Sequence, residues 1–189
     1  SFSKISSRIN QTPVSVAQII EYLGSDWTQM KALIRSSLST DVALLDDTNG
    51  GILSHSGKML RPLISLLLAK AISEPTEASR HYAAAVELLH NATLMHDDVA
   101  DNSSKRRGMP TVSAILGPSA AVLVGDFWLA RAVQLVLEAK GSDKVLGLFT
   151  KTLNDLAEGE LLQMEKAESA DTAEEDYYRI IRCKTATLF

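Results

Sequence analysis

The stretch that decides the fold is residues 87–101, which read ELLHNATLMHDDVAD. On a helix that turns by 100° per residue, six of these side chains fall within an arc of about 100°. They are Glu87, His90, Leu94, Asp97, Asp98 and Asp101. Helical neighbours at i+3 and i+4 have Cβ atoms roughly 5–6 Å apart. We therefore predict a helix that carries a cluster of aspartates on a single face.

A cluster of carboxylates this tight needs a counter-charge. Two like charges about 5 Å apart repel by roughly 3 kcal/mol at an effective dielectric constant of 20. Carboxylate oxygens suit a hard cation that keeps part of its water shell, above all Mg²⁺. Arg106 and Arg107 follow soon after in the sequence, and guanidinium groups match phosphate oxygens bidentately. An acidic face beside an arginine pair predicts a polyanionic ligand that carries metal, such as diphosphate.

Composition and charge limit the class of protein. The chain has 189 residues, of which 46% are hydrophobic and 22% charged, with only 10 glycines and 5 prolines. These totals are typical of one globular domain over residues 1–189, and the shortage of turn-forming residues favours helices. A net charge of −4 argues against a nucleic-acid partner. The single cysteine, Cys183, excludes an internal disulfide and fits a reducing compartment.

Neither the start of the chain nor its most apolar window predicts a membrane segment. The chain begins Ser-Phe-Ser-Lys-Ile, without the long apolar stretch of a signal peptide. The most apolar window, 119–137, contains Asp126 and Arg131, and it favours a buried helix over a membrane span. We expect a soluble, cytoplasmic protein.

Apolar periodicity predicts helices along the rest of the chain, and no segment shows convincing strand alternation. The expected helices begin at Pro13, Ser25, Pro62, Pro75, Pro118 and Ser142, and a last one holds Tyr177 and Tyr178. The helix from Pro75 to Asn102 is expected to be central. The segment Asp46–Gly51 is rich in turn-forming residues and is expected to be a turn. The fold class is therefore predicted to be all-α, with antiparallel helices.

A second basic group lies upstream, in the segment Ser-Gly-Lys-Met-Leu-Arg-Pro at residues 56–62. Pro62 suits the first turn of a helix, where its missing N–H is no loss. Lys58 and Arg61 beside a helix N-terminus would form an anion site. Two solvated charges flanking a buried helix would show the same spacing, and spacing alone does not separate the two interpretations.

These motifs, in this order, resemble those of the trans-isoprenyl diphosphate synthases, in particular their long-chain polyprenyl branch. Residues 97–101 resemble the family's first aspartate-rich motif, DDxxD, and residues 56–62 resemble its GGKxxRP segment, with Ser in place of the first Gly. The remaining matches are Arg106-Arg107-Gly108, Gly125-Asp126 and Lys184-Thr185. Together the matches extend over nearly the whole chain.

The resemblance implies an antiparallel helical bundle of the isoprenoid synthase type around a central cavity, and it implies a role for each matching residue. The Mg²⁺ ligands would be Asp97, Asp98 and Asp101. The allylic diphosphate would meet Arg106, Lys184 and Thr185, with Gln163 near the same site. The diphosphate of isopentenyl diphosphate would meet Lys58, Arg61, His90 and Arg107.

The implied reaction is the Mg²⁺-dependent condensation of isopentenyl diphosphate with an allylic diphosphate, which yields a long-chain polyprenyl diphosphate. Diphosphate leaves the allylic carbon only if its growing negative charge is met, and Mg²⁺ with fixed Arg and Lys side chains can meet it. In the family the released diphosphate takes up the proton that is lost at the end. The resemblance also leads us to expect a homodimer that associates loosely with membranes through its apolar product.

Three other functions are compatible with parts of the sequence. A class I terpene cyclase shares the aspartate-rich site but has no need of a second diphosphate pocket. An HD-type metal phosphohydrolase could use His96 and Asp97, although His96 lies about 100° from Asp97 around the helix, which favours a structural role for it. A non-catalytic partner subunit of a prenyltransferase is the third alternative.

One family element has no counterpart in the sequence. The second aspartate-rich motif, which lies after the Lys-Thr pair in the family, is not found within residues 1–189. We therefore expect a fragment, and we expect the 189-residue chain alone to have little or no synthase activity.

The resemblance also yields a prediction about product length. In the family, the residue five positions before the first aspartate forms the floor of the tunnel, about 7.5 Å along the helix. Here that residue is Ala92, followed by Thr93. Both are small, although ordinary helix packing also selects small residues.

Ala92→Phe in the full-length parent is expected to shorten the products seen by chromatography. An unchanged product spectrum would exclude Ala92 as the floor.

Overall fold

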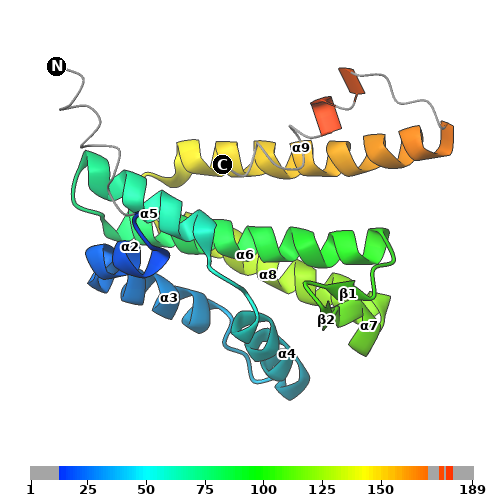
Figure 1. Cartoon of the computed structure of the whole chain (residues 1–189), viewed down its shortest axis with the longest axis horizontal. Coiled ribbons are helices and arrows are strands. Elements are labelled where there is room, and N and C mark those ends of the chain that lie inside the picture. The colour runs from blue at the N-terminus through cyan, green and yellow to red at the C-terminus, as the bar shows by residue number, and fades with distance from the viewer. Residues whose placement is uncertain (1–12, 170–174, 177, 181–189) are drawn as a thin grey trace.

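The computed structural model describes residues 13–169, 175, 176 and 178–180, and these are almost entirely helical (Figure 1). The helices are α2 Val16–Leu23, α3 Ser25–Ser37, α4 Ala43–Ser54, α5 Leu60–Ile72, α6 Glu77–Ala100, α7 Val112–Leu116, α8 Pro118–Glu138 and α9 Ser142–Ser169. Within the described residues the single sheet is a hairpin of two short strands, β1 Lys105–Arg106 and β2 Met109–Pro110. The predicted all-α class is confirmed.

The centre of the fold is the pair α6 and α8, which lie side by side in Figure 1. Helix α6 begins with a capping box, in which the Thr76 hydroxyl accepts from the Ser79 N–H and the Ser79 hydroxyl accepts from the Thr76 N–H. Three consecutive alanines, residues 83–85, are fully buried in it. Small side chains let the helices approach closely, and at Gly125 of α8 a Cβ atom would collide with the His96 imidazole. The predicted central helix is present as α6, which is two residues shorter at each end than expected.

Helices α2, α3 and α5 cover one end of this pair (Figure 1). Trp27, Met30 and Ile34 of α3 are buried in the core that they share with α6. An ion pair of 2.9 Å between Asp26 and Arg80 joins α3 to the first turns of α6. Helix α5 packs against α6, α2 and α3, and the basic segment at residues 56–61 lies at its N-terminal end.

One expectation about the fold is wrong. Residues 46–51 do not form a turn, because they lie in the middle of α4. Asn49 explains the difference, since its buried amide donates to the Leu38 carbonyl (3.0 Å) and accepts from the Trp128 indole N–H (2.8 Å). Tertiary contacts of this kind override a weak local preference for turns. The loop that precedes α5 is therefore shorter than the sequence indicated.

Helix α8 begins at Pro118, as predicted, and lies in the core, as predicted. By length and composition it is the one described helix that could cross a membrane, which is weak evidence because core helices pass the same test. Trp128, Ala132 and Val136 of α8 are buried in the core cluster with α6. This packing fits a core helix.

Candidate functional site

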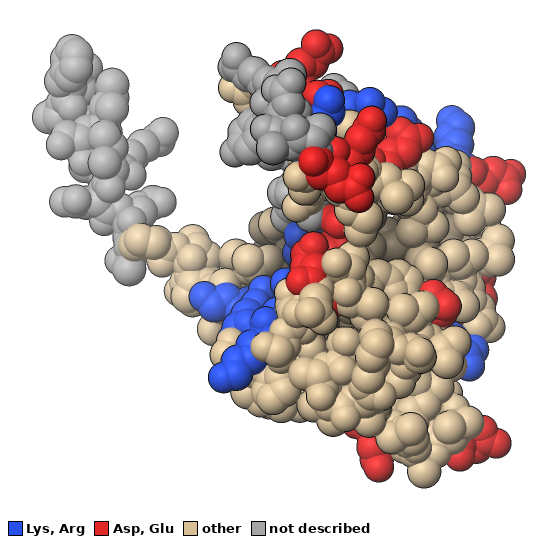
Figure 2. All heavy atoms as spheres, turned by 90° about the vertical axis from the view of Figure 1, so that its right-hand side faces the viewer, with Lys and Arg blue, Asp and Glu red and all other residues tan. Residues whose placement is uncertain are grey.

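One face of α6 borders a cavity of about 770 Å³. Its wall is built by the loop and first turn at the start of α5, by α6 itself and by the β1–β2 hairpin. The cavity brings together six of the residues predicted from sequence: Lys58, Arg61, His90, Asp98, Arg106 and Arg107. Figure 2 views the end of the molecule where α6 terminates, and there acidic and basic side chains lie next to one another. The two cation groups predicted from distant parts of the sequence thus face one cavity.

Asp98 and Arg106 form a bidentate ion pair. The Arg106 Nη2 donates to Asp98 Oδ1 (2.7 Å), and its Nε donates to Oδ1 and Oδ2 (3.1 and 3.2 Å). This bond raises the pKa of Arg106, with Asp97 and Asp101 contributing. The Asp98 side chain is only 9% exposed. The ion pair therefore attaches the hairpin firmly to the last turn of α6.

The acidic face offers suitable donors for Mg²⁺, but only part of a ligand cage. Asp97 is half-buried and Asp101 is exposed at the C-cap, where its N–H donates to the Asp97 carbonyl (2.8 Å). Both oxygens of Asp98 accept from Arg106. Within the described part of the chain, no three His, Cys, Asp or Glu side chains are arranged to hold a metal ion. Carboxylate oxygens still suit a hard cation that keeps several waters. Metal binding by this face therefore stays a prediction.

His90 is a neutral partner of Arg61. Its Nε2 lies 3.1 Å from Arg61 Nη1, and because the guanidinium group can only donate, Nε2 accepts and the ring proton belongs on Nδ1. Burial lowers the pKa of His90 to about 4, and Arg61, Arg107 and Arg106 contribute to the lowering. At neutral pH the imidazole is therefore uncharged and orients the Arg61 side chain.

Arg107 closes the cavity from the hairpin side. Its guanidinium group lies over Gly57, at the place where a Cβ atom of residue 57 would stand. Gly57 has φ +69°, a left-handed conformation that glycine adopts without strain. Both features require glycine at this position. The contact joins two segments that are 50 residues apart in the sequence.

Two residues of the cavity wall received no role from the sequence. They are Glu87 and Asn91, and both are buried. The Asn91 Nδ2 donates to the backbone carbonyl oxygen of Glu87 (2.9 Å) and to Glu87 Oε1 (3.1 Å). The position of Glu87 on the acidic face was visible in the sequence, and the i, i+4 spacing to Asn91 could have suggested the bond. Its burial between basic groups could not be read from the sequence.

His96 packs against α8, away from the cavity. Its Nε2 lies 3.1 Å from Asp126 Oδ1 and 3.2 Å from the Val122 carbonyl oxygen. This geometry agrees with the structural role predicted for His96 and offers no support for an HD-type site. Asp126 does not pair with Arg131, which donates to Gln134 instead.

The other predicted site residues lie elsewhere. Gln163 is exposed on α9, and it does not line the cavity. Ala92 is 1% exposed within the core, and Thr93 donates its hydroxyl to the His90 carbonyl (2.8 Å). Lys184 and Thr185 lie outside the described residues. The roles expected for these residues remain predictions.

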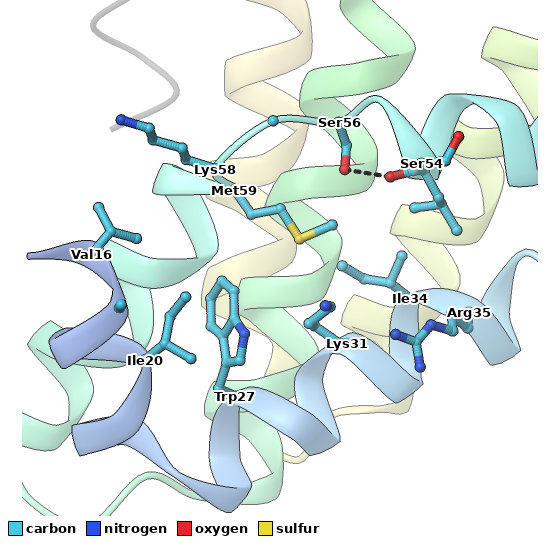
Figure 3. Close-up of a pocket in the computed structure, with 13 residues that line it drawn as sticks. Val16, Ile20, Trp27, Lys31, Ile34, Arg35, Ser54, Ser56, Lys58 and Met59 are labelled. Atoms are coloured by element: carbon cyan, nitrogen blue, oxygen red, sulfur yellow. Dashed lines mark hydrogen bonds between the residues drawn. The ribbon is translucent and has the colours of Figure 1, made fainter.

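A second cavity, of about 580 Å³, lies on the other side of the 54–59 loop. Trp27, Ile20 and Ile34 form its apolar wall beneath Met59, with Lys31 and Arg35 at its border (Figure 3). Lys58 borders both cavities, and its side chain extends away from the apolar wall (Figure 3).

The family model described as polyprenyl synthetase matches residues 42–189. The octaprenyl diphosphate synthase of Escherichia coli (strain K12) is 41% identical over 176 residues, which cover 93% of this chain and 54% of the relative. The chain therefore spans about half the length of the curated relatives that it matches.

Two solved structures share the fold. A decaprenyl diphosphate synthase from Rhodobacter capsulatus superimposes with a TM-score of 0.86 at 36% identity, over 93% of this chain and 54% of that one. A polyprenyl synthase from Caulobacter crescentus CB15, complexed with calcium and isoprenyl diphosphate, gives a TM-score of 0.85 at 35% identity, over 95% and 54%. The arrangement of helices is thus shared with these proteins.

The lowered pKa of His90 predicts a pH-dependent stability. The unfolded chain binds a proton at this residue below its ordinary pKa of 6.5, whereas the folded chain does so only near 4. His90 therefore makes the free energy of unfolding decrease as pH falls from about 6.5 towards 4. In thermal unfolding at pH 7 and pH 4.5, His90→Gln should lose less Tm than the unmodified chain. An equal loss in both proteins would contradict a neutral His90, and His55→Gln, at an exposed histidine, is the control.

The contact between Gly57 and Arg107 predicts an effect of Gly57→Ala. The substitution strains the backbone by about 1–2 kcal/mol and displaces the guanidinium group. Affinity for inorganic pyrophosphate should fall about tenfold or more, the effect of one lost charge-assisted hydrogen bond. Gly141→Ala is the matched control, because Gly141 has φ +73° and open space around its Cβ position. Equal affinity in both variants would show that the Arg107 contact does not serve anion binding.

Proposed function

The chain belongs to the polyprenyl synthetase family, and we propose that it carries the isopentenyl diphosphate pocket and part of the metal site of a Mg²⁺-dependent prenyltransferase. The complete protein would condense isopentenyl diphosphate with an allylic diphosphate and release a polyprenyl diphosphate and diphosphate. The names of the relatives, octaprenyl and decaprenyl diphosphate synthase, support a long-chain product.

The observation that carries this proposal is the convergence on one cavity of two basic groups and of Asp98, at the acidic end of α6. Lys58 and Arg61 reach it from the start of α5, and Arg107 reaches it from the hairpin. Asp98 and Arg106 border the same cavity at the end of α6. A class I terpene cyclase would need the acidic end alone. The second basic group therefore favours an enzyme that binds two diphosphates.

In the proposed mechanism the basic group near His90 binds the diphosphate of isopentenyl diphosphate. Arg61 is oriented by the neutral His90, and Arg107 is held over Gly57. Their guanidinium forks match diphosphate oxygens, and Lys58 adds a mobile point charge. These contacts fix the isopentenyl double bond relative to the end of α6.

Arg106 would act on the leaving diphosphate of the allylic substrate. Mg²⁺ would be held by Asp97, Asp98 and Asp101, and it would neutralise charge on that diphosphate. As the allylic C–O bond breaks, the electron pair leaves with diphosphate. The isopentenyl double bond then forms the new C–C bond, and the released diphosphate accepts the proton that is lost, so no side-chain base is needed.

The proposal extends to the state of the complete protein, which we expect to be a cytoplasmic homodimer. Exposed leucines on α8 and α9, at positions 123, 137 and 148, offer apolar surface for such an assembly. A long apolar product would bring the enzyme to membranes at release.

The assignment of the pocket predicts a loss of affinity on removing its cations. By isothermal titration, Lys58→Ala and Arg61→Ala should each bind isopentenyl diphosphate about tenfold or more weakly, because each removes a charge-assisted hydrogen bond. Lys144→Ala, at an exposed lysine of α9, removes the same charge far along the chain and should bind normally. If all three variants bound like the unmodified chain, the assignment would be wrong.

A further inference from the structure

Glu87 is a buried carboxylate that the proposed reaction does not use. Its exposed fraction is 3%, and it lines the diphosphate cavity together with Arg61, His90 and Arg107. Buried carboxylates are costly unless they are bonded or paired with a cation. A buried negative charge would also repel a diphosphate bound in the same cavity, so its presence there needs a physical explanation.

The carboxylate is held in a fixed orientation. Asn91, itself buried, donates from Nδ2 to the Glu87 carbonyl oxygen at 2.9 Å and to Oε1 at 3.1 Å. The two residues are one helical turn apart on α6, so the side chain of Glu87 is fixed to its own helix. Cations from other elements line the same cavity.

Those cations are Arg61 on α5 and Arg107 in the hairpin. Both attract the Glu87 carboxylate, and Arg61 and Arg107 repel each other. Two like charges that face one half-buried cavity repel more strongly than they would in water. A fixed anion on α6 offsets their repulsion while no ligand is bound.

A bound diphosphate would change this balance, because it brings more than one negative charge to the same two cations. The other charged and titratable groups that line the cavity with Glu87 are His55, Lys58, Arg61, His90, Asp98, Arg106 and Arg107. His90 is neutral, and Asp98 is neutralised by Arg106. Glu87 is thus the anion that the entering diphosphate meets at the Arg61–Arg107 pair.

We propose that Glu87 is a positioning residue, which sets the spacing of Arg61 and Arg107 in the free protein and takes up one proton from solvent when a diphosphate enters. This inference rests on the proposed function, since it requires the cavity to bind diphosphate. The proton adds to the carboxylate, no other bond changes, and the protonated group no longer repels the ligand.

The direction of the electrostatics agrees with this role. Burial raises the pKa of Glu87, against the lowering by the Asn91 hydrogen bond and by Arg61 and Arg107. A diphosphate that engages both arginines weakens the lowering and adds a like charge, so the pKa rises further on binding. A linked proton uptake follows by thermodynamic necessity.

The test compares the 189-residue chain with Glu87→Gln, which keeps the shape and the neutral form of the side chain. Inorganic pyrophosphate is titrated calorimetrically between pH 5.5 and 7.5, in buffers of different ionisation enthalpy, and the slope gives the protons exchanged. Glu77→Gln, at an exposed residue of the same helix, is the control. Protons exchanged by the ligand itself cancel in the comparison between proteins.

The unmodified chain and Glu77→Gln should take up more protons than Glu87→Gln, by up to one per site, and the Glu87→Gln affinity should depend less on pH. Equal uptake by all three proteins at every pH would overturn the role of Glu87 and leave the proposed function intact. Absence of pyrophosphate binding by the unmodified chain would overturn the proposed function, and this inference with it.

Thermal unfolding separates positioning from a merely structural role. Because burial raises the pKa of Glu87, the stability that its protonated form contributes is lost as pH rises through that pKa. Because the pKa is raised overall, the cost of burying the charge exceeds its attraction to Arg61 and Arg107, so the neutral Glu87→Gln should have a Tm at pH 7 equal to or above that of the unmodified chain. A lower Tm combined with unchanged proton uptake would show that Glu87 serves only the fold.

Discussion

The bidentate ion pair between Asp98 and Arg106 is the contact on which the candidate site depends. It joins the last turn of α6 to the β1–β2 hairpin, with three hydrogen bonds of 2.7–3.2 Å. The hairpin would otherwise be a short exposed loop, since two paired strands of two residues each have little stability of their own. Once it is attached, the next residue, Arg107, lies over Gly57 and meets the loop before α5. One side-chain contact thus brings both basic groups to a single cavity.

Helix α6 contributes both to the core and to the cavity. Its alanines pack closely against neighbouring helices and fix the core, while Glu87, His90 and Asp98 line the cavity. Each of these polar groups is matched to a partner: Asn91 for Glu87, Arg61 for His90 and Arg106 for Asp98. Because these partners hold the polar face in place, the cations are oriented before any ligand arrives, and preorganisation of this kind is what anion recognition and charge stabilisation require.

Much of this could be predicted from sequence, because helical periodicity and motif spacing are local signals. The acidic face of α6 and the helix beginning at Pro118 followed from them, and the placing of Arg61 and His90 in one site followed from the resemblance to the trans-isoprenyl diphosphate synthases. Contacts between distant residues could not be predicted in the same way. The helical conformation at Asn49 is supported by a hydrogen bond from Trp128, 79 residues later. Gly57 contacts Arg107, which is 50 residues away in the sequence, and no local pattern predicts this contact. The burial of Glu87 is likewise a product of packing, invisible in a helical wheel.

We propose that one cavity, closed by the hairpin over the start of α5, binds the diphosphate of isopentenyl diphosphate. A crystal structure of the chain with that ligand would test this proposal. The diphosphate oxygens should lie within hydrogen-bonding distance of the Arg61 and Arg107 guanidinium groups, with Arg106 still bound to Asp98. A diphosphate bound elsewhere, or a hairpin detached from α6 while the ligand is held, would contradict it.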